Sequence, residues 1–406
     1  MNAIFTICAK NYLAQALTLR QSVLNKSKVD FYFFLADDEK GIEIENLYSL
    51  SSLNIKNWRS MAFKYNIIEF ATSIKPYCFQ KLFSLGYQKV LYLDPDIFVT
   101  DNLSCIWDSL DNKSIILTPH YLDIIESFTG AVPESVFNRD GIFNLGFAGI
   151  KNDNVGNSIV KWWCSRLNDQ CFSDVYEATF TDQKWMDFVP DFIPDSLEIC
   201  RHFGANVAIW NLHERELLHR DGAFFIRRIS TGEEFPLLFY HFSGFDPFEE
   251  EIINRRHSDF TVKNYPSFKP LIEVYRKMIY GNGYEYYSKM KYAYNTFDNG
   301  TNVVPINRRL YRVMLDAGKI EPEENPFSSR GFFYQLMKNK HLLSRMQISD
   351  KKIIKSEIDK GQKIANCLVY PLFKIILRII GVNKYELLLG LCRRLGHLEY
   401  NVFLLK

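Results

Sequence analysis

Two aspartates, Asp94 and Asp96, follow the apolar run "KVLYL" and flank a single proline. Side chains two positions apart in an extended chain share one side, and Pro95 restricts the backbone between them. Paired carboxylates are ligands that suit Mg²⁺ or Mn²⁺. By itself, Asp-Pro-Asp is more often a turn than a metal site. The apolar run favours metal binding, because a buried strand would hold both carboxylates in place.

Other polar residues with chemical potential stand beside apolar runs. His241 ends "LLFYH" and is followed by Ser243 and Gly244. Taken alone, His241 reads as a half-buried histidine at a strand end, although a neutral imidazole is also a common metal ligand. Gly244 permits a close approach to the backbone.

Three further polar segments each have a structural and a functional reading. Asn144 and Gly146 in "FNLG" form either a turn or a sugar contact, with equal weight. Asp182 and Gln183 in "FTDQKW" stand where Thr181 or Asp182 could cap a helix. The polar-aromatic segment 201–215 holds Asn206 and Trp210, which could face an acceptor sugar or belong to the core.

The elements around these residues alternate between strands and helices. Residues 3–9, 30–38 and 89–99 read as strands, and 12–24 and 75–86 as helices. Pro76 suits the first turn of its helix, and Gly86 suits the C-terminal cap. The alternation predicts an α/β fold with a mostly parallel, doubly wound sheet, which binds ligands at the carboxyl ends of its strands. Asp94 and Asp96 would lie at such an end.

The chain changes character between residues 255 and 270, where a polar, tyrosine-rich segment leads into a more basic, helical remainder. We therefore predict a domain of residues 1–260 that binds the ligand, and a mainly helical region of residues 261–406. That region could contact an acceptor, a second copy of the chain or a membrane.

Composition sets broad limits on the protein class. The chain has 406 residues, is 47% hydrophobic and 24% charged, and carries a net charge of +2, which indicates no nucleic-acid partner. The eight cysteines are scattered without a CxxC pair, which favours reduced thiols in a cytoplasmic protein. The N-terminus lacks the basic region of a signal peptide, and no uninterrupted apolar run reaches about 18 residues, so we predict no transmembrane helix.

The C-terminal segment is basic and apolar. From residue 361 to the end, seven Lys or Arg residues accompany two Glu, and Lys374 and Arg378 lie four apart. Such a tail could lie peripherally on the inner face of an anionic membrane. The alternative is a helical domain that packs on the rest of the chain or forms a homo-oligomer.

The order of these motifs resembles a known family. The segment "KPYCFQKLFSLGYQKVLYLDPDIFV" resembles the donor-binding segment of GT-A-fold, nucleotide-sugar-dependent glycosyltransferases, above all the glycogenin-like and lipopolysaccharide galactosyltransferase group. "FTICAKNYLAQALTLRQSV" resembles the first strand and helix of that group, and "GIFNLGFAGI", "FTDQKWMDFV" and "HFSG" resemble its later motifs in order. The resemblance covers roughly residues 1–250.

The resemblance implies roles for individual residues. Asp94, Asp96 and His241 would bind Mn²⁺ or Mg²⁺, and Asp182 and Gln183 would act beside the reacting sugar carbon. Donor contacts would come from Cys8, Ala9, Asn11, Tyr12, Lys75, Asp94, Asn144, Gly146, Ser243 and Gly244. Asn11 is also a good N-cap for the helix that follows it.

The sequence departs from the family after "HFSG". The family often continues to a Lys-Pro that holds the diphosphate, whereas Asp246 follows here. We expect Lys75 to supply the missing cation; Lys10, Arg255 and Arg256 are the alternatives.

The resemblance implies a metal-dependent, retaining hexosyltransferase. It would move sugar from a nucleotide diphosphate sugar, with a UDP-sugar favoured, to a glycan, lipid-linked or protein acceptor. Two alternatives stay open. A sugar-phosphate nucleotidyltransferase would carry a Gly-rich basic loop after the first strand, which "CAKNYLAQ" lacks. A non-catalytic carbohydrate-binding protein of the same fold would not need Asp94, Asp96 and His241.

Overall fold

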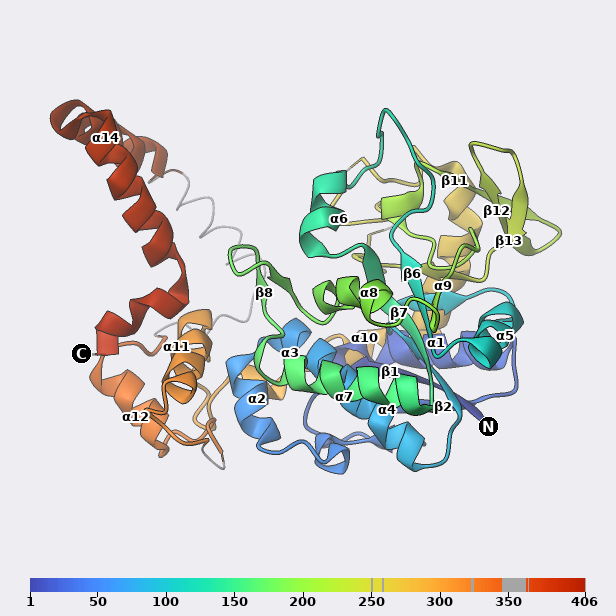
Figure 1. Ribbon diagram of the computed structural model, residues 1–406, viewed down its shortest axis with the longest axis horizontal. Helices are drawn as coiled ribbons and strands as arrows, with labels where there is room; N and C mark the ends of the chain where they lie inside the picture. The colour runs from blue at the N-terminus through green and yellow to red at the C-terminus, as the bar shows by residue number, and fades with distance from the viewer. Residues whose placement is uncertain (250, 258, 323–324, 345–362, 364, 406) are drawn as a thin grey trace. The chain divides into compact units, whose positions relative to one another are not determined.

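A computed structural model describes residues 1–249, 251–257, 259–322, 325–344, 363 and 365–405 of the chain (Figure 1). The chain forms two compact units. Unit 1 consists of Met1–Lys56 and Ile67–Tyr292, and unit 2 of Asn57–Asn66 and Ala293–Lys406.

This division differs from the predicted boundary between residues 260 and 261. Helices α9 (Lys269–Gly281) and α10 (Tyr284–Tyr287) belong to unit 1. The reason is aromatic packing: Tyr275 of α9 stacks on Phe242, with ring centroids 3.8 Å apart and planes within 8°. The change in composition near residue 260 therefore does not coincide with the boundary between the two units, which lies after Tyr292.

Unit 1 is built on a seven-stranded sheet of order β10-β6-β7-β4-β1-β2-β3. Strand β7 runs antiparallel to β4 and β6, and the other pairings are parallel. The predicted mostly parallel sheet is confirmed, and β7 makes it a mixed one. The strands are β1 (Asn2–Cys8), β2 (Asp30–Leu35), β3 (Leu47–Tyr48), β4 (Lys89–Leu93), β6 (Ile115–Pro119), β7 (Phe143–Lys151) and β10 (Leu197–Ile199).

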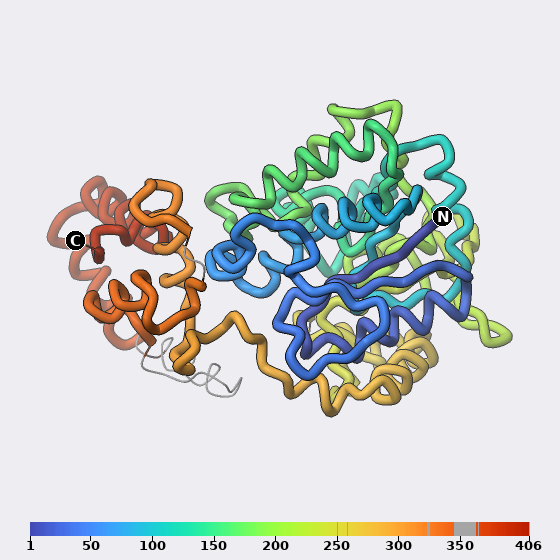
Figure 2. The backbone as a smooth tube through the Cα atoms, turned by 90° about the horizontal axis from the view of Figure 1, so that it is seen from below, coloured from blue at the N-terminus to red at the C-terminus, as the bar shows by residue number. Residues whose placement is uncertain are grey.

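Helices cover both faces of this sheet, as Figure 2 shows for α7 on one side and α1 and α9 on the other. Alternation along β1 sends Ile4 into a core with α1 and α5, whereas Phe5 meets Phe79 of α4 edge to face at 4.9 Å. Because both faces are covered, the central strands are mostly apolar. The helices named here are α1 (Leu13–Leu24), α4 (Lys75–Ser84), α5 (Ser104–Asn112) and α7 (Asn154–Asp169).

Helix α4 leads into β4 and has the predicted ends. Pro76 lies in the first turn, and Gly86 follows the helix with φ +94°, a conformation that favours glycine. The amide of Tyr87 donates to the Leu82 carbonyl at 3.3 Å and closes the cap. This turn sets the direction in which β4 starts.

Smaller elements complete unit 1. Strands β5 (Ile97–Val99) and β14 (Phe239–His241) form a two-stranded ribbon, while β11 (Arg215–Arg220), β12 (Ala223–Arg228) and β13 (Glu234–Pro236) form a meander. Strands β8 (Ser173–Asp174) and β9 (Thr179–Phe180) form a hairpin. The remaining helices are α3 (Ile67–Ser73), α6 (Glu134–Asp140), α8 (Val189–Phe192), η1 (Lys10–Tyr12), η2 (Leu50–Leu53), η3 (Lys184–Phe188), η4 (Ile209–Asn211) and η5 (Pro266–Phe268).

Unit 2 is helical over its described residues and has an aromatic core. The Phe63 ring lies within 5.7 Å of the rings of Phe297, Tyr311, Phe327 and Phe333. Its helices are α2 (Trp58–Lys64), α11 (Pro305–Asp316), α12 (Phe332–Asn339), α14 (Tyr370–Gly396), η6 (Ala293–Asn295), η7 (Ala365–Val369) and η8 (Leu398–Leu405).

One helix among the described residues, Ala365–Gly396, is long and apolar enough to cross a membrane by length and composition, with a mean hydropathy of 1.6. No such helix was predicted from the sequence, because the chain lacks an uninterrupted apolar run of about 18 residues. Lys374 and Arg378 interrupt the run without making the segment polar on average.

Candidate active site

The aspartate pair occupies a turn rather than the middle of a strand. Strand β4 ends at Leu93, and the Ile97 amide donates to the Asp94 carbonyl at 3.0 Å, which closes the turn. The single strand predicted over residues 89–99 is thus wrong, since β5 leaves the main sheet and pairs with β14. Proline between the aspartates favours this turn. The change of sheet places Asp96 next to His241.

Asp94, Asp96 and His241 form one cluster. The His241 Nε2 atom lies 3.2 Å from Asp96 Oδ1 and 3.6 Å from Asp94 Oδ2, and the three ligand atoms lie within 4.8 Å of one another. His241 is buried and both carboxylates are partly exposed. Two hard oxygens and one imidazole nitrogen, open to solvent on one side, fit Mn²⁺ or Mg²⁺.

The three groups shift one another's protonation. Burial raises the pKa of Asp94, more than the charges of Lys75 and His241 lower it. Burial also opposes ionisation of Asp96, but the charge and hydrogen bond of His241 hold the pKa of Asp96 below its usual value. Burial would lower the pKa of His241, yet Asp96 raises it above its usual value. The cluster is therefore a concentrated negative site that favours a cation.

Gly146 of β7 leaves the space that His241 occupies. A Cβ atom at this position would lie 2.4 Å from His241 Cε1 and 2.7 Å from Nδ1. The Gly146 carbonyl also accepts from the Asp94 amide at 2.8 Å. Gly146 therefore positions two of the three candidate ligands.

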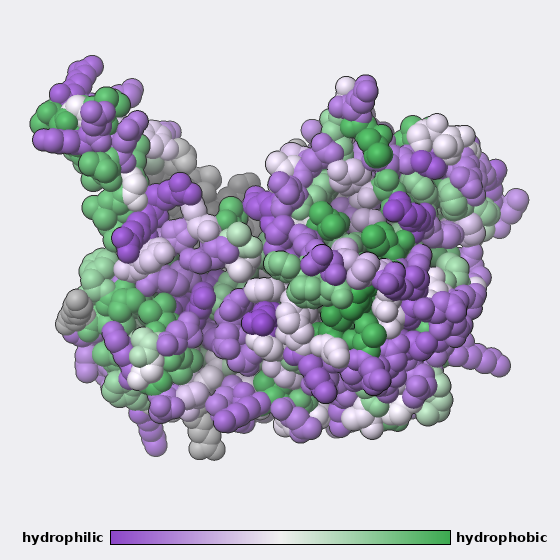
Figure 3. Space-filling model, in the orientation of Figure 1, coloured by the Kyte–Doolittle hydropathy of each residue, from purple (hydrophilic) through white to green (hydrophobic). Residues whose placement is uncertain are grey.

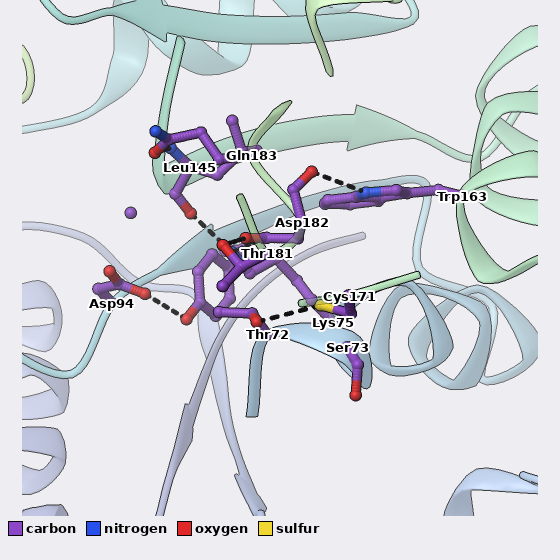
Figure 4. A network of polar contacts seen from close by, with 12 residues as sticks. Thr72, Ser73, Lys75, Asp94, Leu145, Trp163, Cys171, Thr181, Asp182 and Gln183 are labelled. Carbon is purple, nitrogen blue, oxygen red and sulfur yellow. Dashed lines mark hydrogen bonds and ion pairs between the residues drawn. The ribbon is translucent and has the colours of Figure 1, made fainter. Parts of the chain in front are cut away.

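A second polar network lies beside the cluster (Figure 4). The Lys75 ammonium donates to the Asp182 carboxylate and, at 2.7 Å, to the Leu145 carbonyl. It also faces the Tyr92 ring at 4.1 Å, and the Tyr92 hydroxyl donates to Asp94. Lys75 and Tyr92 therefore link Asp182 to the cluster.

Asp182 and Gln183 are held by their surroundings. Trp163 donates through Nε1 to the Asp182 carbonyl at 3.3 Å. Gln183 accepts from the Leu145 amide through Oε1 and donates through Nε2 to the Asp140 carbonyl, both at 3.2 Å. The predicted helix start at Thr181 or Asp182 is not found, because η3 begins at Lys184 and Thr181 has φ +47°. Both side chains are thus fixed in orientation.

Asn144 and Asn206 share a buried hydrogen-bond network. Asn206 donates to Thr118 Oγ1 at 2.9 Å and to Asn144 Oδ1 at 3.0 Å, and its own φ is +50°. Trp210 lies edge-on to His241 with ring centroids 5.1 Å apart. Asn144 and Asn206 therefore lie in one network, and Trp210 packs against the candidate metal ligand His241.

Residues 8–12 lie where β1 meets α1. Cys8 and Ala9 are buried, whereas Tyr12 is exposed. Partial burial, and after it the charge of Asp96, raises the pKa of Tyr12. The prediction that Asn11 caps α1 is wrong, because Asn11 lies inside η1 and Tyr12 holds the cap position without a side-chain bond.

Three of the four cationic side chains predicted to hold the diphosphate are paired with carboxylates of the protein. Lys75 is 1% exposed and bonded beneath the site, so it does not present a free charge to a phosphate. Lys10 pairs with Asp38 at 2.7 Å, and Arg255 with Asp246 at 2.8 Å. Arg256 is exposed, and its positive charge lowers the pKa of Asp96 and of His241.

The loop that carries Ser243 and Gly244 is braced by the segment of Arg256. Asn254 donates to the Ser243 carbonyl at 2.6 Å and accepts from the Arg256 amide at 2.8 Å. Gly244 has φ +77°, which favours glycine. Sequence reasoning missed Asn254, for which no local pattern exists, and Tyr92, whose position two residues before Asp94 was an available signal.

Comparison with known proteins agrees with this arrangement. Residues 3–157 match the family model described as "Glycosyl transferase family 8". The match spans less than half of the chain. With the mixed sheet and the carboxylate–imidazole cluster, it shows that the chain is similar to glycosyltransferases of the GT-A fold. The matched segment contains Asp94, Asp96, Asn144 and Gly146.

Two relatives come from Bacillus subtilis (strain 168), and both are uncharacterized proteins. YfnF is 26% identical over 254 residues, which cover 60% of this chain and 82% of YfnF. YfnD is 28% identical over 165 residues, which cover 40% of this chain and 49% of YfnD.

Solved structures are similar at lower identity. The galactosyltransferase LgtC, in complex with donor and acceptor sugar analogs, is 16% identical; the match covers 69% of this chain and 96% of that one, with a TM-score of 0.42. A glycosyltransferase involved in glycosylation of the major capsid of PBCV-1 is 13% identical, with coverage of 60% and 94% and a TM-score of 0.35.

Proposed function

We propose that this glycosyltransferase moves a hexose-type sugar from a nucleotide diphosphate sugar, with a UDP-sugar favoured, to a glycan, lipid-linked or protein acceptor. The observation that carries the proposal is the cluster of Asp94, Asp96 and His241, whose ligand atoms lie within 4.8 Å of one another. Retention of the anomeric configuration follows the family resemblance. The scattered cysteines favour a cytoplasmic enzyme.

The same cluster would hold the divalent cation. When bound, Mn²⁺ or Mg²⁺ neutralises the charge that develops on the leaving diphosphate. Asp94 and Asp96 would bind it through carboxylate oxygens, and His241 through Nε2, the nitrogen that faces both carboxylates.

The remaining site residues would orient the two sugars. Asp182, fixed by Lys75 and Trp163, would orient an acceptor hydroxyl. Gln183 keeps a second lone pair on Oε1, which could stabilise positive charge at the sugar carbon. Tyr12, exposed near Asp96, would offer a face to the base or ribose.

Arg256 is our candidate for the cation that holds the diphosphate. Lys75, Lys10 and Arg255 are each committed to a carboxylate. Arg256 is exposed and acts electrostatically on the cluster. Arginine also matches the geometry of phosphate oxygens.

The direct test measures slow hydrolysis of UDP-sugars by the purified chain with Mn²⁺, followed by EDTA. A thermal-shift panel of UDP-, GDP- and CMP-sugars would identify the donor class. We expect Asp96→Asn to reduce turnover by at least about 100-fold, because even residues that only orient metal ligands are worth about 10–100-fold. The control is Asp111→Asn, since Asp111 is 64% exposed and pairs with Lys89. Neither binding nor turnover across the panel would refute the proposal.

A further inference from the structure

Helix α14 is two helices joined by a sharp bend. Gly381 has φ +74° and ψ +166°, which is not helical. The rings of Phe373 and Tyr385 lie 6.1 Å apart, whereas twelve residues of continuous helix would separate them by about 18 Å along the axis. The chain therefore turns back at Gly381 and forms a helical hairpin, residues 365–396, which we call the C-terminal hairpin.

The C-terminal hairpin buries none of its described residues. Ile379 and Leu387, one on each helix, are each 76% exposed. Figure 3 shows hydrophobic surface, in green, interspersed with hydrophilic surface, in purple, over the part of the molecule that α14 forms. An apolar surface of this extent marks an interaction site rather than a surface made for water.

Charges occupy only a narrow arc of the first helix. At 100° per residue, Lys374 and Arg378 lie close together there, and apolar side chains fill most of the remaining circumference. The charges of the second helix are spread more widely, but Leu387 and Leu391 lie close together on one side of it. A wide apolar face with a narrow basic edge is the pattern of helices that lie in a membrane interface.

The charge balance favours an anionic surface. Between residues 363 and 405, two acidic residues accompany six basic ones. The acidic residues are Glu386 and Glu399, and the basic ones are Lys363, Lys374, Arg378, Lys384, Arg393 and Arg394. Glu399 is already paired, since Arg309 Nε lies 3.1 Å from its carboxylate. The charge that remains exposed is therefore mostly positive.

The hairpin is held at its base within unit 2. The pairing of Glu399 in η8 with Arg309 and Arg312 of α11 follows directly after the second helix. Asn401 donates to the carbonyls of Leu395 and His397, both at 2.9 Å, and so closes the helix end. A membrane contact made by the hairpin would therefore anchor unit 2 to the membrane.

We propose that the C-terminal hairpin inserts its apolar arcs into one leaflet of a bilayer that contains anionic lipids, with its Lys and Arg side chains at the headgroups. The bend at Gly381 divides the segment into helices that are each shorter than the roughly 20 residues needed to span a bilayer. The hairpin thus lies in one face of the membrane and does not cross it. This inference is independent of the transfer reaction, and vesicle binding tests it without turnover.

The test is sedimentation of the full chain with vesicles of phosphatidylcholine alone or mixed with phosphatidylglycerol. We expect at least about tenfold stronger binding to the mixed vesicles, weakened by high salt. Ile379→Asp with Leu387→Asp should lower binding at least about tenfold, because each places a charge in the apolar arc. The matched control is Ile229→Asp with Val274→Asp, two exposed apolar residues of unit 1. Sugar-nucleotide hydrolysis should be unchanged in both.

Two outcomes would overturn the proposal. One is wild-type protein that stays in the supernatant with anionic vesicles, or a double variant that binds as well as the wild type. The other is a dimer, detected by light scattering, that the same double variant dissociates without any vesicle binding; the arcs would then be an interface between copies.

The bend itself has a separate test. A Cβ at Gly381 meets nothing within 4 Å, so Gly381→Ala changes only the backbone preference and favours a straight helix. We expect alkaline carbonate to extract the wild type from vesicles, and to extract Gly381→Ala less completely. Wild-type protein that resists extraction would indicate a spanning helix and would refute the one-leaflet arrangement.

Discussion

Lys75 and Asp182 form a buried ion pair that joins α4 to the segment before η3. Their side chains are 1% and 3% exposed, and both lie in the polar network of Figure 4. Lys75 also faces the Tyr92 ring, and the Tyr92 hydroxyl donates to Asp94, one of the three candidate metal ligands. Lys75 was expected to contact the donor. Instead it connects Asp182 to Asp94 through Tyr92.

Removing one partner of this pair should destabilise the protein. Lys75→Met leaves Asp182 as an uncompensated buried charge, which costs about 3–5 kcal/mol of unfolding free energy. Urea denaturation would measure the loss. Lys89→Met is the control, because Asp111 is exposed and such pairs contribute about 0–1 kcal/mol. A double variant, Lys75→Met with Asp182→Asn, should recover part of the stability; equal losses in single and double variants would contradict the pairing.

Gly146→Ala should damage the metal site without unfolding the chain. The added Cβ would lie 2.4 Å from His241 Cε1, so His241 must move away from the carboxylates. We expect the affinity for Mn²⁺ to fall at least about tenfold, in line with other changes that misalign metal ligands. Isothermal titration with Mn²⁺ and UDP measures it. Gly281→Ala, whose Cβ meets nothing within 4 Å, serves as the control. Unchanged affinity would show that His241 is not a ligand in this position.

Arg256→Gln should weaken binding of the diphosphate specifically. A charge-assisted hydrogen bond contributes about 1.5–3 kcal/mol, which corresponds to at least about a tenfold weaker Kd for UDP. Uridine, which lacks the phosphates, should bind the variant and the wild type equally. Arg255→Gln is matched in sequence and charge, but Arg255 pairs with Asp246, so its effect should be smaller. If both variants bind UDP normally, the diphosphate cation lies elsewhere.

His120 should make the stability depend on acid pH. Burial between Phe137 and Trp210 lowers the pKa of His120 from 6.5 to about 4. Between these two pKa values, His120 is protonated in the unfolded chain and neutral in the folded chain. The contribution of His120 to the free energy of unfolding is therefore complete above pH 6.5 and is lost as the pH falls toward 4. The expected contribution at pH 5 is a loss of about 2 kcal/mol relative to neutral pH.

Denaturation midpoints at neutral pH and at pH 5 would measure this contribution. In His120→Gln the acid loss should be smaller by about the stated amount. His219→Gln should behave like the wild type, because His219 is exposed on β11. An identical acid loss in His120→Gln would assign the effect to other groups.

Local pattern predicted much of unit 1. Alternating apolar strands, Pro76 at the start of α4 and Gly86 after its end are short-range signals, and the structure confirms each of them. The motif order around Asp94, Asp96 and His241 likewise indicated the residues that form the cluster. Residue types and their spacing were sufficient here because each signal depends on neighbours within a few positions.

Other features depended on contacts between distant segments. Lys75 pairs with Asp182, which lies 107 positions away in the sequence, and so does not face a phosphate. Gly146 is needed because the ring of the distant residue His241 fills the space that a Cβ would occupy. The boundary after Tyr292 was decided by the stacking of Tyr275 on Phe242. Composition indicated that the C-terminal hairpin is helical, apolar and basic. That this segment folds back on itself follows only from the non-helical backbone at Gly381. The sequence by itself determined the strands, the helix ends and the chemistry of the cluster, because these follow from local preference and residue type. Only the tertiary structure decided which charges pair and where the cores divide, because burial depends on which distant residues fill the same space.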